Sequence, residues 1–305
     1  MESDRSLVDV STQDAAITQC IQISARALLI AVPDGRSWLT EIGTSGTTAL
    51  PVSPVAAERA SLAASVVEGA MSAGLARPGN VPIPGPYTLL RYVRWLVGNY
   101  IFAGQTPGLF RRASDRLDAA GRPDLAAFAR EKAAEEEGHA DLAYRDLQAL
   151  GLPAAEVVRL LHPPSADVFA DRFRAYVESD TPIAHFGFSY CLERMAVARD
   201  RAYIQGIEAI CPPGIRALRF LKVHSDIGSD SGHVHEQLAL FESLGGAELT
   251  SVVRAVYETA RMLAEQPKMD EALSDEEIAR RLRLAGIEVP RARVDTGKGS
   301  KALAT

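Results

Sequence analysis

Apolar residues after residue 86 recur at intervals of three and four positions, which is the periodicity of helices with one buried face. Helices are predicted at 87–103, 106–120, 124–150, 165–178, 182–210, 213–244, 248–265 and 274–284. Proline and glycine mark several of their ends, such as Pro123 at the start of the third helix and Gly245 after the sixth. Alternating β-branched residues are nearly absent, so the pattern predicts an all-α protein.

The first 85 residues are less regular. Helices are predicted at 12–31 and 55–75, with an irregular connection between them and a proline-rich break, RPGNVPIPGP, after the second. We therefore expect three parts. Residues 1–85 form an N-terminal extension packed on the core, residues 86–265 form the core, and residues 266–305 form a short helix and a flexible, basic tail.

Composition narrows the classes of protein. The chain is 47% hydrophobic and 24% charged with a net charge of −6, which gives no electrostatic basis for binding nucleic acid or an anionic membrane. Its three widely spaced cysteines, Cys20, Cys191 and Cys211, match neither a disulfide framework nor a zinc pattern and fit a reducing compartment. No signal-peptide pattern and no apolar run of about 18 residues is present, so we expect a cytoplasmic protein.

A polar segment interrupts the apolar pattern at 220–236, FLKVHSDIGSDSGHVHE. It holds three of the six histidines and two aspartates: His224, His233, His235, Asp226 and Asp230. On a regular helix Asp226, Asp230 and His233 fall on one stripe, while His224 and His235 share the opposite side. Two carboxylates and an imidazole on one face are ligands that iron and manganese accept.

The same segment is a poor helix former. Gly228 and Gly232 each cost about 1 kcal/mol relative to alanine, and serines add to the effect. Weak propensity between core-like flanks suggests a cost retained for function, and we expect residues 223–235 to be distorted without metal and helical with it. The alternative is a solvated, locally frayed helix.

A second candidate group lies in the predicted helix 124–150. Glu136 precedes His139 by three residues and Glu135 precedes it by four, so either carboxylate can share its face. Glu-x-x-His on a helix supplies a carboxylate and an imidazole to dinuclear iron or manganese sites in helical bundles. Acidic residues are common in this chain, however, and a solvated acidic face accounts for at least one of the three consecutive glutamates.

Glu193 lies within apolar sequence, HFGFSYCLERMAVA, in the predicted helix 182–210. The positions three and four residues away carry no cation, and an unpaired buried carboxylate would be very costly. We interpret Glu193 as a metal ligand. The alternatives are an exposed glutamate or one paired with a cation from another helix.

The order of these features resembles the heme-oxygenase-like di-iron oxidases and oxygenases. The resemblance covers about residues 86–264 and rests on the ExxH helix ending in DLQALG, the glutamate within the next long helix, and the Asp/His-rich helix with DSGH. The stretch YVRWLVGNYIFAGQTPGLFRRA is also similar to that family's first core helix. The resemblance implies an all-α bundle of about seven core helices that holds two irons and activates O2.

Carried over by position, the resemblance implies that Glu136, His139, Glu193, Asp230 and His233 are metal ligands. The family's last motif usually reads H-x-x-x-D-x-x-H, and Asp226 occupies the place of its first histidine. His224 and Glu135 remain as alternative ligands, and His224 faces away on a regular helix unless the GSDSG segment is distorted. The expected cofactors are two Fe ions, or an Fe/Mn pair, with O2 as co-substrate.

The sequence thus predicts a non-heme di-iron oxidase or oxygenase that acts on a small organic molecule and takes electrons from an external reductant. N-oxygenation of an amine or amino acid is the first expectation, and oxidative decarboxylation or C–C cleavage at the same site is the alternative. A further alternative is a non-enzymatic helical metal-binding or interaction protein. A homodimer is compatible with all of these.

Overall fold

The computed structural model describes residues 18–44, 46–76, 88–228, 230–270 and 273–289. These residues divide into two compact units. A sheet unit draws on the ranges 1–80, 179–192 and 232–265, and a helical unit draws on 81–178, 193–231 and 266–305. The expected loose start, the proline-rich break and the basic tail lie outside the described residues.

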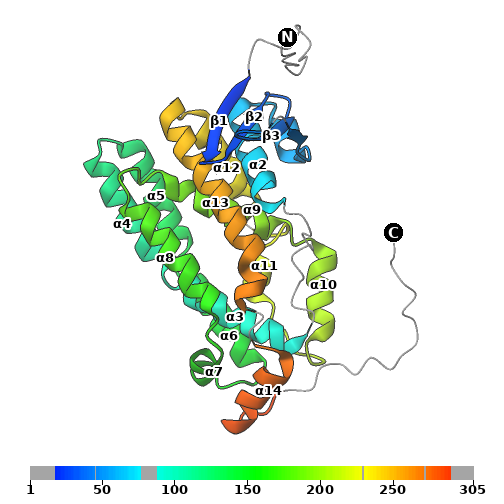
Figure 1. Cartoon of the computed structure of the whole chain (residues 1–305). Coiled ribbons are helices and arrows are strands. Elements are labelled where there is room, and N and C mark those ends of the chain that lie inside the picture. Colours follow the sequence, from blue (N-terminus) through cyan, green and yellow to red (C-terminus); the bar gives the residue numbers. More distant parts are fainter. Residues whose placement is uncertain (1–17, 45, 77–87, 229, 271–272, 290–305) are drawn as a thin grey trace, which may run out of the picture. The chain divides into compact units, whose positions relative to one another are not determined.

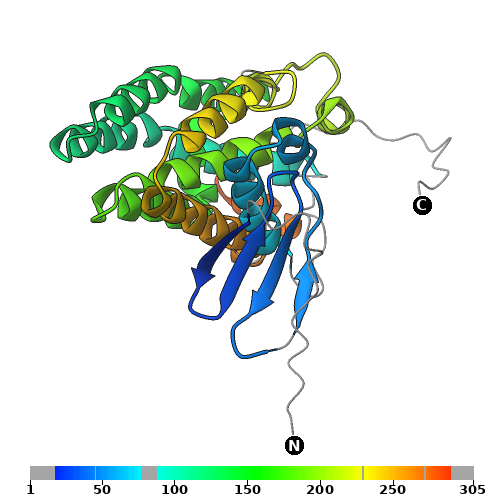
Figure 2. The same cartoon turned by 90° about the horizontal axis from the view of Figure 1, so that it is seen from above.

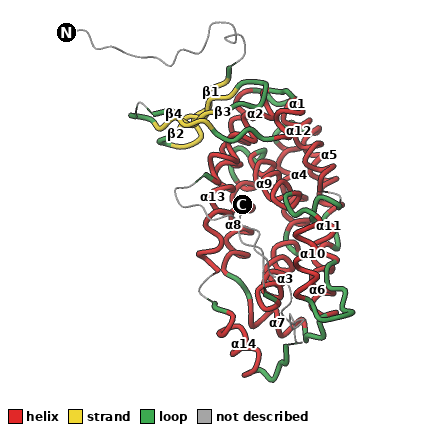
Figure 3. The backbone as a smooth tube through the Cα atoms, turned by 90° about the vertical axis from the view of Figure 1, so that its right-hand side faces the viewer, coloured by secondary structure: helices red, strands yellow, loops and turns green. Residues whose placement is uncertain are grey.

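The sheet unit begins with four strands, two in place of the helix predicted at 12–31 and two within the segment expected to be an irregular connection. The strands are β1 (Gln19–Ser24), β2 (Ala27–Ala31), β3 (Ser37–Glu41) and β4 (Thr47–Ala49), antiparallel in the order β1-β2-β3-β4 (Figure 2). The prediction was wrong because burial alternates with a period of two: Ile21 and Ile23 are buried, and Gln22 between them is exposed. Among the described residues the strands are confined to this sheet (Figure 3).

Helix α2 (Leu62–Leu75) packs on β1, β2 and β3, and α1 (Pro54–Arg59) precedes it. The single helix predicted at 55–75 is broken at Ala60, which adopts a left-handed conformation with φ 49°. The Ser61 hydroxyl then caps α2 by accepting a hydrogen bond from Ala64 N at 3.2 Å. A Cβ at Gly69 would lie 2.7 Å from Ser37 Oγ, so this glycine permits the close approach of α2 to β3.

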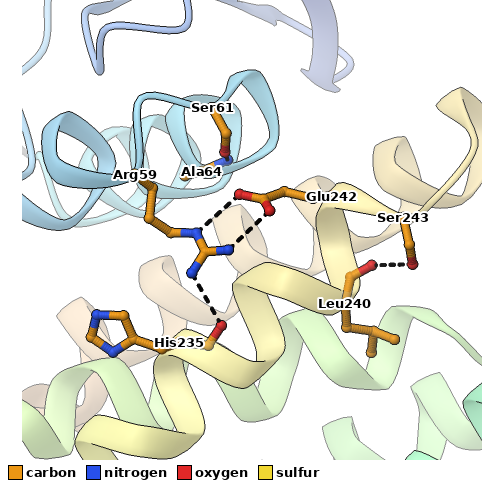
Figure 4. Close-up of polar contacts among 7 residues, drawn as sticks. All are labelled: Arg59, Ser61, Ala64, His235, Leu240, Glu242 and Ser243. Carbon is orange, nitrogen blue, oxygen red and sulfur yellow. Dashed lines mark hydrogen bonds and ion pairs between the residues drawn. The ribbon is translucent and has the colours of Figure 1, made fainter.

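The remaining helices of the sheet unit come from later in the chain: most of α9 (Ala184–Val197), α12 (Asp230–Glu242) and α13 (Gly246–Asp270). Arg59 ties α1 to α12 through a two-pronged contact with the Glu242 carboxylate, 2.9 Å for each nitrogen, and its third nitrogen lies 3.5 Å from the His235 carbonyl oxygen (Figure 4). The buried Glu68 carboxylate of α2 accepts hydrogen bonds from the Tyr190 and Ser53 hydroxyls.

The helical unit contains α3 (Leu89–Ala103), α4 (Thr106–Ala119), α5 (Pro123–Glu135), α6 (His139–Ala149), α7 (Ala154–Leu161), α8 (Pro164–Glu178), α10 (Arg201–Ile210), α11 (Arg219–Val223) and α14 (Asp275–Leu284). Helix α3 contacts α6, α7, α8 and α14, while α4 packs along α5 and against α8 (Figure 1). The core of the helical unit includes the fully buried residues Tyr92, Leu96, Leu147 and Val157. The helices predicted at 87–103, 106–120, 165–178, 248–265 and 274–284 are confirmed, and α7 was not predicted.

Three predicted long helices are each divided in two. Helix 124–150 breaks between α5 and α6 at Gly138, whose φ of 83° is outside the range of right-handed helices. Helix 182–210 breaks where Asp200 caps α10 by accepting a hydrogen bond from Tyr203 N at 2.8 Å. Helix 213–244 breaks between Val223 and Asp230. None of the helices that the structure describes is long and apolar enough to cross a membrane.

The close packing of α9 on α13 within the sheet unit can be tested by substitution of a glycine at the contact. A Cβ at Gly187 would collide with the Val252 carbonyl oxygen and would lie 3.1 Å from Ala255 Cβ. Gly187→Ala should therefore lower the free energy of unfolding by about 1–3 kcal/mol through overpacking. The matched control is Gly206→Ala in α10, where nothing lies within 4 Å, which should raise stability by about 0.5–1 kcal/mol. Denaturant unfolding measures both, and equal stability of the two variants would contradict this packing.

Candidate metal centre

Three potential metal ligands converge in the helical unit: Glu136, His139 and His224. One donor atom from each, a carboxylate oxygen or an imidazole nitrogen, lies within 4.8 Å of the other two. Glu136 follows the last residue of α5, His139 is the first residue of α6, and His224 follows the last residue of α11. The three side chains therefore come from helix ends rather than from helix faces.

The turn between α5 and α6 brings Glu136 and His139 together. Glu136 N still donates to Lys132 O at 3.0 Å, so the carboxylate keeps its helical direction. Gly138 then interrupts the helix with a left-handed φ of 83°, and His139 N donates to Glu136 O at 3.2 Å. The result is a contact of 3.1 Å between His139 Nδ1 and Glu136 Oε2. The Glu-x-x-His spacing thus works here across a turn, whereas the sequence predicted it along a continuous helix.

His224 reaches the other two ligands because the chain leaves the helical path after Val223. Its backbone N–H donates to Phe220 O at 3.1 Å and closes α11. Its imidazole lies against the Phe220 ring, with centroids 4.4 Å apart, and meets His139 edge-on at 4.8 Å. The turn that follows folds back so tightly that a Cβ at Gly228 would collide with the Val223 carbonyl oxygen.

The surroundings of the Glu136–His139–His224 cluster favour a cation. The Glu136 and His139 side chains are only 14% and 16% exposed, so water screens them weakly. Glu136 also lies at the carboxyl end of α5, where the helix dipole places partial negative charge. Lys132, 2% exposed, offsets part of that charge by pairing with Glu135 at 2.8 Å.

The other predicted ligands lie outside the Glu136–His139–His224 cluster. Glu135 pairs with Lys132, and Asp226 is exposed, its N–H lying 3.4 Å from Arg199 O. Glu193 is buried in the last turns of α9 but is not one of the three clustered donors. Asp230 is the first residue of α12, and His233 lies further along α12 in the sheet unit.

The prediction that Asp226 shares a helix stripe with Asp230 and His233 is corrected, because the helix on which that stripe depended is interrupted between Val223 and Asp230. The interruption also removes the reason for placing His224 on the opposite side. The signal for this outcome was in the sequence, since the low-propensity glycines and serines begin directly after His224.

The donor set fits a metal ion of the non-heme iron class. Two imidazoles and one carboxylate with further coordination positions open form the ligand set of many non-heme Fe(II) oxygenases. Ligands at about 2.1 Å from a metal and at right angles to each other are about 3 Å apart. The 3.1 Å between His139 Nδ1 and Glu136 Oε2 meets that requirement, and a donor atom of His224 lies within 4.8 Å of both residues' donor atoms.

Comparison with known proteins identifies the fold. No protein-family model and no curated protein sequence matches this chain. A domain of unknown function with a heme oxygenase-like fold, from Shewanella denitrificans OS217, matches with a TM-score of 0.51 and 16% identity over 72% of this chain and 86% of its own. A TenA homologue from Pseudomonas syringae pv. tomato strain DC3000 matches with a TM-score of 0.50 and 15% identity, over 67% and 92% of the two chains. The predicted fold class, a mostly helical protein with a heme-oxygenase-like fold, is confirmed, and the small N-terminal sheet is an addition to it.

Substitution of the clustered histidines tests the site directly. His139→Ala and His224→Ala should each weaken Co(II) binding by more than the 10- to 100-fold that typically follows loss of an outer partner, because each removes a ligand atom. His162→Ala is the matched control, since His162 is 42% exposed and pairs with Asp167 at 3.0 Å. Titration followed by the Co(II) absorption bands measures the affinities. Equal affinity in all three variants would exclude the cluster as the binding site.

The turn after α11 gives a second test. Metal binding at His224 should raise the amide protection of residues 224–228, because coordination restrains a segment with weak helix propensity. Protection of α3, at residues 89–103, should barely change. Hydrogen exchange with and without Fe(II) or Mn(II) measures both regions. Unchanged protection of residues 224–228 on saturation with metal would contradict the prediction.

Proposed function

We propose that this protein is a non-heme iron oxidoreductase that activates O2 and oxidises a small organic molecule. The observation that carries the proposal is the convergence of Glu136, His139 and His224 from three helix ends. The heme-oxygenase-like fold is consistent with it, although the fold alone does not define a reaction. Iron bound there would supply the O2 binding and the redox chemistry, with electrons from an external reductant.

Each residue of the cluster has a distinct part in this proposal. The Glu136 carboxylate offsets one positive charge of a divalent ion. The two imidazoles bind through unprotonated nitrogens and therefore release protons as the metal enters, so binding should weaken as the pH falls. The Phe220 ring covers one side of His224 and limits the approach of water.

The proposal includes a second metal, as in the di-iron proteins that the sequence resembles. Glu193 and Asp230, both in the helical unit, are its proposed ligands by sequence position. N-oxygenation of an amine or amino acid is the proposed reaction, with oxidative decarboxylation or C–C cleavage as the alternative at the same site. A non-enzymatic helical interaction protein is the competing function, and it would neither need iron nor consume O2.

Anaerobic loading tests the proposal. Protein incubated with Fe(II) and freed of excess metal should retain close to two irons per chain, and one if only the Glu136–His139–His224 cluster fills. Exposure to O2 should then produce a transient optical spectrum and O2 consumption that candidate amines, amino acids or carboxylic acids accelerate. His162→Ala should behave as wild type and His224→Ala should not.

Two results would reject the proposal at different levels. Folded protein that retains only trace iron after such loading would rule out the metal site. Iron-loaded protein that consumes no O2, with or without these substrates, would leave a metal-binding protein without the proposed oxidative activity.

A further inference from the structure

Helix α11 is too short to orient itself. It has five residues, Arg219–Val223, and carries His224 at its carboxyl end. Isolated helices of this length are not stable in water, because the nucleation cost exceeds the gain from so few hydrogen bonds. Its first turn also lacks a local cap, since the N-cap residue Leu218 makes no side-chain hydrogen bond. The direction of α11, and with it the position of His224, must come from other elements.

Asp146 of α6 supplies the missing cap from outside the helix. Its Oδ2 accepts a hydrogen bond from Phe220 N at 3.0 Å, at the second position of α11. A helix's own N-cap side chain normally accepts from this position or the next. Its Oδ1 accepts from Arg219 Nη1 at 3.0 Å. Asp146 is fully buried, and a buried carboxylate without hydrogen-bond partners would have a very high desolvation cost.

Other contacts fix the chain on either side of this cap. The Tyr92 hydroxyl of α3 donates to the Ala217 carbonyl oxygen at 2.6 Å, immediately before α11. The Trp95 ring of α3 meets the Phe220 ring edge-on at 5.7 Å. Phe220 in turn contacts the His224 ring, so the residue whose N–H is held by Asp146 is also the residue that supports the imidazole.

The geometry of α6 connects Asp146 to the metal-binding cluster. His139 and Asp146 are seven residues apart, which places them on the same face of α6 two turns from one another. One face of α6 therefore carries both the candidate ligand His139 and Asp146, which anchors α11 and with it His224. A shift of α11 relative to α6 would change the distance between His139 and His224.

We propose that Asp146 is a positioning residue for His224: it caps α11 across the helix–helix contact and so holds the second imidazole in register with His139 and Glu136. The inference rests on the proposed metal site for its functional meaning. It also gives a role to the aspartate of the DLQALG motif, which the metal-binding scheme itself does not use.

A purely structural role is the alternative, and the test must separate the two. In the positioning role, replacement of Asp146 should lower metal affinity only as long as His224 contributes a ligand. In a structural role, replacement would lower affinity to the same extent whether or not His224 is present. A double-mutant cycle between the two residues measures this difference.

The experiment compares Co(II) affinities of the full-length wild type, Asp146→Ala, His224→Ala and the double variant. Asp146→Ala should weaken binding by about 10- to 100-fold, as for other residues that orient a ligand. In the His224→Ala background the same change should have an effect of less than about 3-fold. Asp141→Ala, an exposed aspartate on the same helix, is the control and should leave the affinity unchanged.

Asp146→Asn is a milder second variant, included in case Asp146→Ala does not fold. It keeps an oxygen that can accept from Phe220 N but loses the charge, so its Co(II) affinity should fall between those of wild type and Asp146→Ala. Hydrogen exchange gives a readout that needs no metal: the Phe220 and His224 amides should lose protection in Asp146→Ala, lose less of it in Asp146→Asn, and keep it in Asp141→Ala.

The outcomes separate the two proposals. Unchanged Co(II) affinity in Asp146→Ala, or an equal loss with and without His224, would overturn the positioning role. Wild type that binds no Co(II) would reject the metal site, and the exchange measurement would then decide alone whether Asp146 holds α11. Undiminished protection of the Phe220 amide in Asp146→Asn and Asp146→Ala would overturn the inference in that case too.

Discussion

The interruption of the helix at Gly138 is the constraint on which the arrangement of the candidate site depends. With φ at 83°, this residue ends α5 and starts α6 in a new direction, a conformation that residues with a side chain rarely adopt. Glu136 therefore lies at a helix carboxyl end, where negative partial charge gathers, and His139 lies at the beginning of the next helix. On a continuous helix the two side chains would also be neighbours, because residues three apart share a face. The break places their 3.1 Å contact at the junction of two helix ends, where His224 lies within reach of both.

Three buried charged side chains, in both units, have partners close by. Asp146 is held by Arg219 and the Phe220 N–H, Lys132 by Glu135, and Glu68 by two hydroxyl groups. Burial raises the pKa of the Asp146 carboxyl, and its two partners oppose that change. Such pairing is needed because a buried charge without a partner would destabilise the fold by several kcal/mol. In the helical unit it also decides geometry, since the carboxylate of Asp146 fixes the start of the helix that presents His224.

The sequence was sufficient for the helical class, for several helix positions and for the residues around which the site forms, because hydrophobic periodicity and Glu-x-x-His spacing are local properties. It was insufficient at three helix breaks that no proline marks. Gly138, Asp200 and the segment after Val223 each divide a helix that periodicity alone predicted to be continuous. The strands at residues 19–31 were missed for a related reason: short alternating segments such as QCIQIS carry too few positions to outweigh a helix-rich background.

The broken helix at 213–244 shows why ligand assignment from helical faces is fragile. Asp226, Asp230 and His233 lie on one face only if they belong to one continuous helix, in which each residue is rotated by about 100° from the one before it. Once α11 ends at Val223, that rotation no longer relates residues 226 and 230, and His224 is free to turn toward α6.

A ligand set with His224 in place of Asp226 differs in its chemistry as well as in its geometry. Replacing an aspartate by an imidazole removes one negative charge from the ligand set, so a divalent ion held by Glu136, His139 and His224 keeps a net positive charge. Such an ion attracts electron-rich co-ligands more strongly than one neutralised by carboxylates. The position of a helix end therefore determines which side chains, and how much negative charge, a metal ion at this site would meet.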